Sequence, residues 1–129
     1  MTPGIALFCG ALLFLGVLGI WQWSLGRHAR AHIGQPVPEL PGALGQATRG
    51  DILLWFHSPH CGPCRAMRPK IAELVQSGAA IEVDVSDNLE IAQAFGVMAT
   101  PTTIRIRQGH IEQVSTGSLS PRALESMAG

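Results

Sequence analysis

The first feature of the hydropathy pattern is a long apolar segment near the N-terminus. Residues 5–23 carry no charged side chain and are almost continuously apolar. A helix of this length spans the ~30 Å hydrocarbon core of a bilayer, and Trp21 and Trp23 stand at its end, where indole rings favour the membrane interface. A domain this small could hardly cover a helix that is apolar on every face. We therefore expect residues 1–25 to form a transmembrane anchor, with membrane contact over residues 5–25.

A cleaved signal peptide is the alternative for this segment. Ala29, Arg30 and Ala31 have the small-x-small form of a cleavage site. However, no Lys or Arg precedes the apolar run, and Arg27 and Arg30 crowd the site. These two departures from the signal-peptide pattern favour an anchor that is retained.

The pattern changes after the anchor. Residues 26–50 are rich in Gly, Pro and Ala and predict a linker that runs into the edge of a domain, with turns at the prolines. From residue 51 onwards, apolar runs alternate with segments of helical spacing. The predicted order is strand, helix, strand, helix, strand, strand and helix, over residues 52–56, 61–77, 80–85, 89–95, 102–107, 111–116 and a short final helix.

Local signals support the limits of these elements. Gly78 predicts the end of the first of these helices, and Ser86 or Asp87 would cap the second. Ser120 would cap the final helix, with Pro121 at its first position. Strands that alternate with helices and finish in a hairpin predict an α/β fold, with a mixed central sheet flanked by helices over residues 51–129.

Charged and apolar residues alternate along the third predicted strand. Arg105 and Arg107 alternate with apolar residues over 102–107. This pattern is typical of a half-exposed strand, and a solvated face is the common location for such charges. We therefore expect both arginines to be exposed.

Composition excludes one broad class of function. The 129 residues leave room for one small domain, and the formal net charge is zero. There is no basic block to neutralise phosphates. Aromatic residues make up only 5% of the chain, so few side chains are present on which nucleic-acid bases could stack. Nucleic acid is therefore not an expected partner.

The cysteines point to chemistry rather than to scaffolding. Cys9 lies in the apolar run, whereas Cys61 and Cys64 form a C-x-x-C motif. A disulfide-stapled scaffold would need more pairs at wider spacing. With His57 and His60 the motif offers four metal ligands, but structural zinc sites usually join two separated ligand pairs. A c-type haem needs His directly after the second cysteine, and Arg65 stands there instead. We expect neither a metal nor a cofactor.

Several motifs together resemble thioredoxins. Residues 60–65 read His-Cys-Gly-Pro-Cys-Arg at the start of a predicted helix, and Pro69 lies inside that helix. Residues 95–102 resemble the segment of the family that ends in a cis-proline, and Gly109 and Gly117 match its late glycines. The resemblance covers about residues 51–129. It implies a thioredoxin-like fold and thiol–disulfide oxidoreductase activity on protein substrates.

The resemblance and the physics of helix ends agree on the roles of the cysteines. Cys61 would stand at a helix N-terminus, where unpaired N–H groups and the helix dipole favour a thiolate. Cys61 is therefore the expected exposed nucleophile, and Cys64 would resolve the mixed disulfide. His60, Gly62 and Pro63 complete the active-site loop.

The same resemblance assigns a substrate groove. It implies a cis peptide bond at Pro101, next to the cysteines. The backbone of Thr100 could then pair with an extended substrate segment, as in strand addition. Thr100 and Pro101 are therefore the expected groove residues.

Two positions depart from the family pattern. His60 stands where thioredoxins usually carry Trp. Thioredoxins also carry a buried acid in the strand before the motif, and here Trp55 lies near that place. Glu82 and Asp84 on the neighbouring strand are the remaining candidates to accept the proton of Cys64, although both residue types usually lie at the surface.

Two features of the sequence disagree on which side of the membrane the domain lies. Arg27, His28 and Arg30 follow the span, and the positive-inside rule would place the domain in the cytoplasm. A tethered redox motif favours the oxidising side. We expect a single-pass protein of the inner (cytoplasmic) membrane, with its domain on the periplasmic side and a membrane redox partner. The alternative function is a non-catalytic binding module or assembly factor, since the fold alone does not fix activity.

Overall fold

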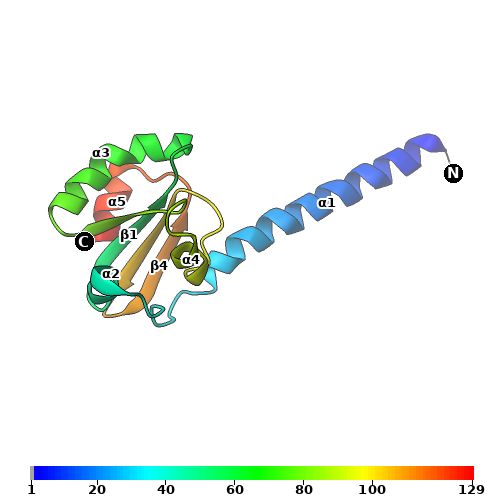
Figure 1. Ribbon diagram of the computed structural model, residues 1–129. Helices are drawn as coiled ribbons and strands as arrows, with labels where there is room; N and C mark the ends of the chain where they lie inside the picture. The colour runs from blue at the N-terminus through cyan, green and yellow to red at the C-terminus, as the bar shows by residue number, and fades with distance from the viewer. Residues whose placement is uncertain (1) are drawn as a thin grey trace.

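A long helix at the N-terminus projects away from the rest of the chain (Figure 1). In this computed structural model, residues 2–129 are described, except for the side chains of residues 25, 26 and 28–30. Helix α1 (Pro3–Arg30) continues past the predicted anchor end at residue 25. Its apolar part, Pro3–Ser24, contains an 18-residue stretch with a mean hydropathy of 2.3, none of which is buried by the protein. The helix therefore has the length and composition of a membrane span or a signal sequence. The side chains of the proposed cleavage site at 29 and 30, and of His28, lie outside the described ones.

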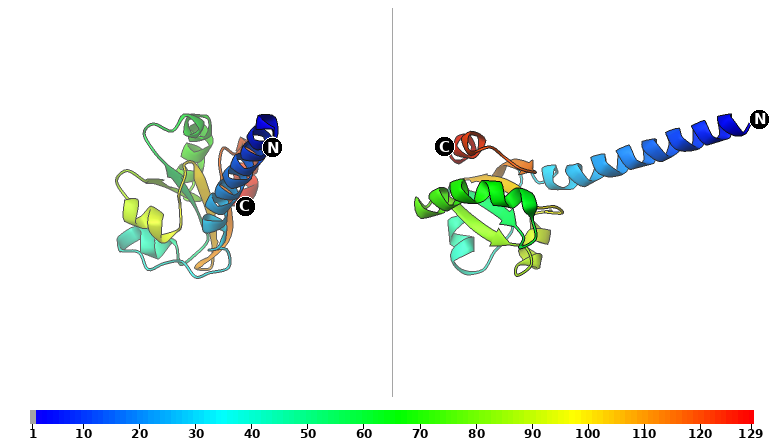
Figure 2. Two further views of the ribbon diagram at one scale, coloured as in Figure 1. Left: turned by 90° about the vertical axis from the view of Figure 1, so that its right-hand side faces the viewer. Right: turned by 90° about the horizontal axis from the view of Figure 1, so that it is seen from above.

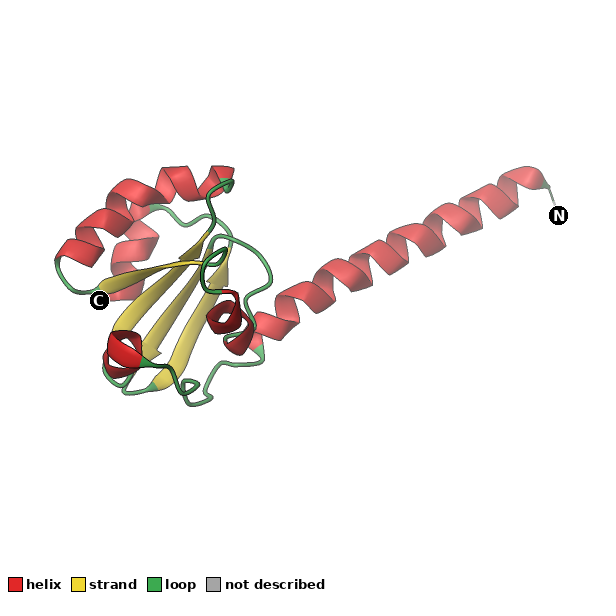
Figure 3. Cartoon of the chain, viewed as in Figure 1, coloured by secondary structure: helices red, strands yellow, loops and turns green. Residues whose placement is uncertain are grey.

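The rest of the chain is built on one four-stranded sheet, shown in yellow in Figure 3. The strands are β1 (Ile52–His57), β2 (Ala80–Asp84), β3 (Thr102–Arg107) and β4 (His110–Thr116). Their order in the sheet is β2-β1-β3-β4, with β1 and β2 parallel and the other pairs antiparallel. The predicted mixed sheet is confirmed.

Helices cover both faces of this sheet (Figure 2). Helices α3 (Gly62–Gln76) and α5 (Pro121–Ala128) pack on the face that carries Leu53 and Trp55. The opposite face carries Ile52, Leu54 and Phe56, which pack with Phe95 and with α4 (Leu89–Ala94). Successive residues of β1 point to opposite faces, so its continuous apolar run fills both layers of the core.

The segment after α1 is ordered against the sheet. The N–H of Gly34 donates to the Ile111 carbonyl at 2.7 Å, and the N–H of Ile111 donates to the Gln35 carbonyl at 3.0 Å. Residues 34–37 thus run along the start of β4. A short helix that the sequence did not predict, α2 (Gly42–Ala47), follows, and Leu40 and Leu44 pack on the core. Much of the predicted linker is therefore part of the folded domain.

The predicted limits of the helices are mostly confirmed. Gly78 follows α3 with a φ of 79°, a backbone conformation that favours glycine. Ser120 caps α5, because its hydroxyl accepts from the N–H of Ala123 at 3.1 Å. The predicted cap of α4 was wrong. Asn88 occupies the cap position without a side-chain cap bond, whereas Ser86 donates to the Asp84 carboxylate.

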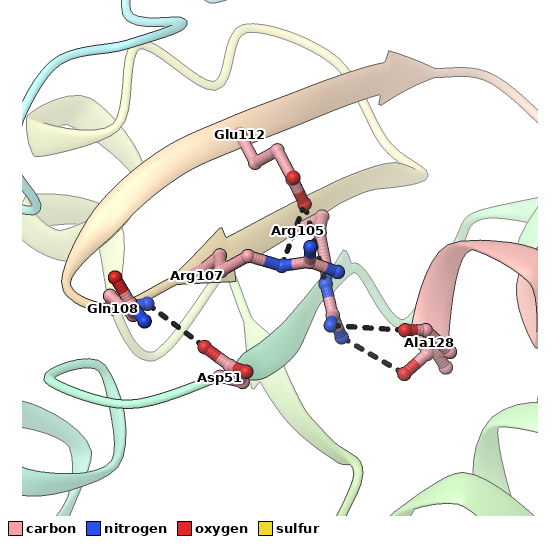
Figure 4. A network of polar contacts seen from close by, with 7 residues as sticks. Asp51, Arg105, Arg107, Gln108, Glu112 and Ala128 are labelled. Carbon is pink, nitrogen blue, oxygen red and sulfur yellow. Dashed lines mark hydrogen bonds and ion pairs between the residues drawn. The ribbon is translucent and has the colours of Figure 1, made fainter.

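The prediction that both arginines of β3 are exposed was wrong for one of them. Arg105 is only 5% exposed. Its guanidinium donates to the carbonyl of Ala128 at 2.9 Å and to that of Gly129 at 3.4 Å, and it lies 3.7 Å from the Glu112 carboxylate (Figure 4). Arg107 is half-exposed and reaches the same carboxylate at 3.5 Å. Since α5 covers this face, alternation along β3 does not mark a solvated side.

Candidate functional site

The two cysteines of the motif lie at the N-terminus of α3. They are joined by a disulfide, with Cα atoms 5.3 Å apart. Cys61 is the N-cap residue, and its sulfur accepts a hydrogen bond from the N–H of Cys64 at 3.2 Å. Cys61 is 8% exposed and Cys64 is fully buried. The expectation of an exposed nucleophile is therefore corrected: Cys61 is the more accessible of the two cysteines, but most of its surface is covered.

The local sequence accounts for this geometry. Gly62 and Pro63 are exposed residues in the first turn of α3, where a proline lacks only an N–H that has no helical partner. The first turn contains no acidic side chain. Negative charge that develops on Cys61 therefore meets the positive end of the helix dipole without a neighbouring carboxylate to oppose it.

A second loop is fixed beside the cysteines. The N–H of Cys61 donates to the carbonyl of Ser58 at 3.3 Å. The hydroxyls of Ser58 and Thr100 form a hydrogen bond of 3.1 Å. The Thr100–Pro101 peptide bond is cis, as the resemblance implies. Ser58, which sequence reasoning missed, thus connects the cysteine loop to the predicted groove residues.

The segment that leads to the cis peptide bond carries an exposed apolar side chain. His60 and Ala99 are exposed, Thr100 is half-buried and Pro101 is buried. Met98, which the sequence analysis also missed, is 61% exposed. Its flexible thioether side chain suits contact with varied apolar partners.

The bond between the two loops gives a testable prediction. Replacing Ser58 with Ala should lower the free energy of unfolding by about 1 kcal/mol, the usual net contribution of one hydrogen bond. Because the Thr100 loop is then held less firmly, KM for a protein disulfide should rise while the rate with dithiothreitol stays the same. Urea unfolding and steady-state kinetics measure the two effects. An equal loss of rate with the protein disulfide and with dithiothreitol would contradict a role of Ser58 in the groove.

A layer of side chains lies under the cysteines. Trp55, at the place of the missing acid, is fully buried in the cluster that contains both cysteines. The ring of His57 stacks on it, with centroids 4.7 Å apart and planes 20° apart. The Arg68 guanidinium lies 5.8 Å from the centre of the Trp55 ring.

The two carboxylates named from the sequence lie on the edge strand β2. Glu82 pairs in register with Trp55 and is exposed. Asp84 pairs with His57 and is half-buried. Its pKa is lowered, chiefly by the hydrogen bonds from the side chain and backbone of Ser86, which stabilise the carboxylate. Asp84 is therefore a weak base.

Within the described part of the chain, no three His, Cys, Asp or Glu side chains are grouped to hold a metal ion. The chemistry that this site offers is the reversible opening of its disulfide.

Comparisons with known proteins agree with this fold and motif. The family model for thioredoxin matches residues 43–128. The thioredoxin of Bacillus subtilis (strain 168) is 31% identical over 86 residues, which make up 64% of this chain and 83% of that protein. The thioredoxin of Haemophilus influenzae is 35% identical over 72 residues, 53% of this chain and 67% of that protein.

Solved structures give the same answer. The thioredoxin of Fasciola hepatica superposes with a TM-score of 0.56 at 28% identity, over 65% of this chain and 84% of that one. The oxidised mitochondrial thioredoxin 3 of Saccharomyces cerevisiae gives a TM-score of 0.55 at 27% identity, over 63% and 79% of the two chains. With its disulfide between Cys61 and Cys64 at the head of a helix, this chain belongs to the thioredoxin family and is a thiol–disulfide oxidoreductase.

Proposed function

We propose that the protein is a membrane-anchored oxidoreductase of the cell envelope, which exchanges its Cys61–Cys64 pair with cysteines of other proteins outside the cytoplasmic membrane. The observation that carries this proposal is the combination of two features in one chain. A disulfide lies at the N-terminus of α3, and the uncovered apolar helix α1 leads into the same domain.

Cys61 is the nucleophile of this exchange. In the reduced protein its thiolate attacks a substrate disulfide, and one substrate thiolate leaves. Cys64 then attacks the sulfur of Cys61, the second substrate thiolate leaves, and the domain disulfide forms. Two electrons pass from the domain to the substrate in this direction, and the reverse sequence oxidises a substrate dithiol. His60, Gly62 and Pro63 form the surface over which the substrate sulfur approaches.

Thr100 and Pro101 form the groove that holds the substrate chain. Within residues 2–129, no hydrogen bond uses the backbone N–H or carbonyl of Thr100. An extended segment could therefore pair with this backbone. Met98 offers an apolar contact next to it. These features favour partly unfolded proteins as substrates.

The end of α1 supports membrane attachment. The guanidinium of Arg27 lies 4.2 Å from the centre of the Trp23 ring, a cation–π contact. Trp and Arg together are suited to the boundary between hydrocarbon and water, because each has an apolar body and a polar tip. A redox partner in the membrane would then return the Cys61–Cys64 pair to its starting oxidation state after each exchange.

One experiment tests the proposal. The full chain in sealed membrane vesicles is equilibrated with graded glutathione or dithiothreitol buffers and trapped with a maleimide that does not cross membranes. A reversible two-electron transition, with trapping in right-side-out vesicles, is the expected result. A midpoint near about −270 mV would identify a reductant and one near about −120 mV an oxidant. Trapping only in inverted vesicles would overturn the envelope location, and the absence of any transition would overturn the exchange reaction.

A further inference from the structure

We propose that His57 accepts the proton of Cys64 when that thiol attacks the mixed disulfide, an inference that rests on the proposed exchange reaction. Cys64 is fully buried among Trp55, Met67 and other apolar side chains. A thiol in such surroundings must lose its proton before it can attack, and the charged form is disfavoured by burial. A base within the same layer is therefore needed.

The position of His57 suits this role. It is the last residue of β1, and its ring stacks on Trp55, so it lies on the sheet face that α3 and both cysteines cover. Its Nδ1 atom is buried and has no hydrogen-bond partner among the described residues. A buried ring nitrogen without a partner can accept a proton, either directly or through one water. Imidazole is also the side chain that exchanges protons near neutral pH.

The charged groups around His57 favour the same assignment. On β2, Asp84 lies opposite His57 in register, and Glu82 lies two residues before it, opposite Trp55, and is exposed. On α3, Arg68 lies over the Trp55 ring. Asp84 is held as a carboxylate by Ser86 and can balance an imidazolium, but it is a poor proton acceptor for that reason. His57 is thus the base of this layer, and Asp84 supports its charged form.

Cys64 transfers its proton to His57, the Cys64 thiolate attacks the sulfur of Cys61, and the substrate thiolate leaves with the bonding pair. The imidazolium then returns its proton to the departing thiolate or to water. In the reverse direction, His57 as imidazolium protonates Cys64 when the domain disulfide opens.

The test uses the reduced full chain in detergent micelles, with Cys9 replaced by Ala so that only two thiols remain. Mixing with 5,5′-dithiobis(2-nitrobenzoate) releases one thionitrobenzoate when Cys61 attacks and a second when Cys64 resolves the mixed disulfide. Stopped-flow absorbance measures both phases from pH 5 to 9. His57→Phe keeps the stacked ring but removes the base, and His57→Gln is a second variant. His110→Phe, at an exposed position at the start of β4, is the control.

In the unsubstituted protein the rate of the second phase should fall at acidic pH, because a protonated imidazole cannot accept the proton of Cys64. In His57→Phe the second phase should be slower by about 100-fold at pH 7, at the lower end of general-base effects. The first phase should not change. An unaltered second phase, or equal slowing of both phases in variants whose thermal unfolding is normal, would overturn the assignment. Absence of the second release from the unsubstituted protein would instead count against the proposed function.

Discussion

Replacing Cys64 with Ser should leave the protein locked to its substrates. Cys61 keeps its position at the N-terminus of α3, so its attack on a substrate disulfide continues. The mixed disulfide then has no internal thiol to resolve it. Turnover should fall by at least about 1,000-fold, the scale on which loss of a group that acts covalently reduces other enzymes. Non-reducing electrophoresis of the full chain with a disulfide-bonded substrate measures the trapped complex.

The matched variant is Cys61→Ser, which removes the nucleophile and keeps Cys64. Cys64 is fully buried, so this variant should form no covalent complex and should show no turnover. If both variants trapped the substrate equally, the assignment of Cys61 as the nucleophile and Cys64 as the resolving thiol would be refuted. A variant of Cys61 that retained full cellular function would point to the binding-module alternative.

Replacing Arg105 with Ala should cost about 3 kcal/mol of unfolding free energy, because the buried guanidinium loses its hydrogen bonds to the end of α5 and its side chain no longer fills the space between β3 and α5. The guanidinium joins β3 to the last turn of α5 through the Ala128 carbonyl and approaches Glu112. Its loss should free α5, which covers Leu53 and Trp55 through Leu124 and Met127. Urea unfolding followed by circular dichroism measures the change.

Arg107→Ala is the control for this prediction. Arg107 lies two residues further along β3 and contacts the same Glu112 carboxylate, but its side chain is 50% exposed. Exposed ion pairs contribute about 0–1 kcal/mol, so this variant should be nearly as stable as the parent. Similar losses from both replacements would mean that burial of Arg105 does not matter for the fold.

The elements that the sequence predicted well are those with strong local signals. The run at 52–56, the stop at Gly78 and the Ser120 cap each have one physical explanation, and the structure confirms them. The pairing of the cysteine motif with Pro101 depended on family resemblance, because no local rule places two loops 40 residues apart next to one another.

The features that the sequence did not reveal depend on tertiary contacts. Helix α2 has two glycines in six residues, which is a poor helix composition, and it is held by the packing of Leu44 on the core. Arg105 was assigned to a solvated face because polar alternation usually marks one, whereas here helices cover both faces. His57 stands at a strand end, where nothing in its neighbours' identity shows that its ring turns inward onto Trp55.

The path of residues 34–37 along β4 also bears on self-association. β4 is an outer strand, and an outer strand with free backbone groups is a template for sheets that extend from one molecule to the next. Residues 34–37 pair with the start of that strand, and Pro36 among them has no N–H to donate to a neighbouring molecule. The opposite edge, β2, is five residues long and carries Glu82 and Asp84. Both edges of the sheet therefore disfavour the addition of a strand from a second copy of this chain.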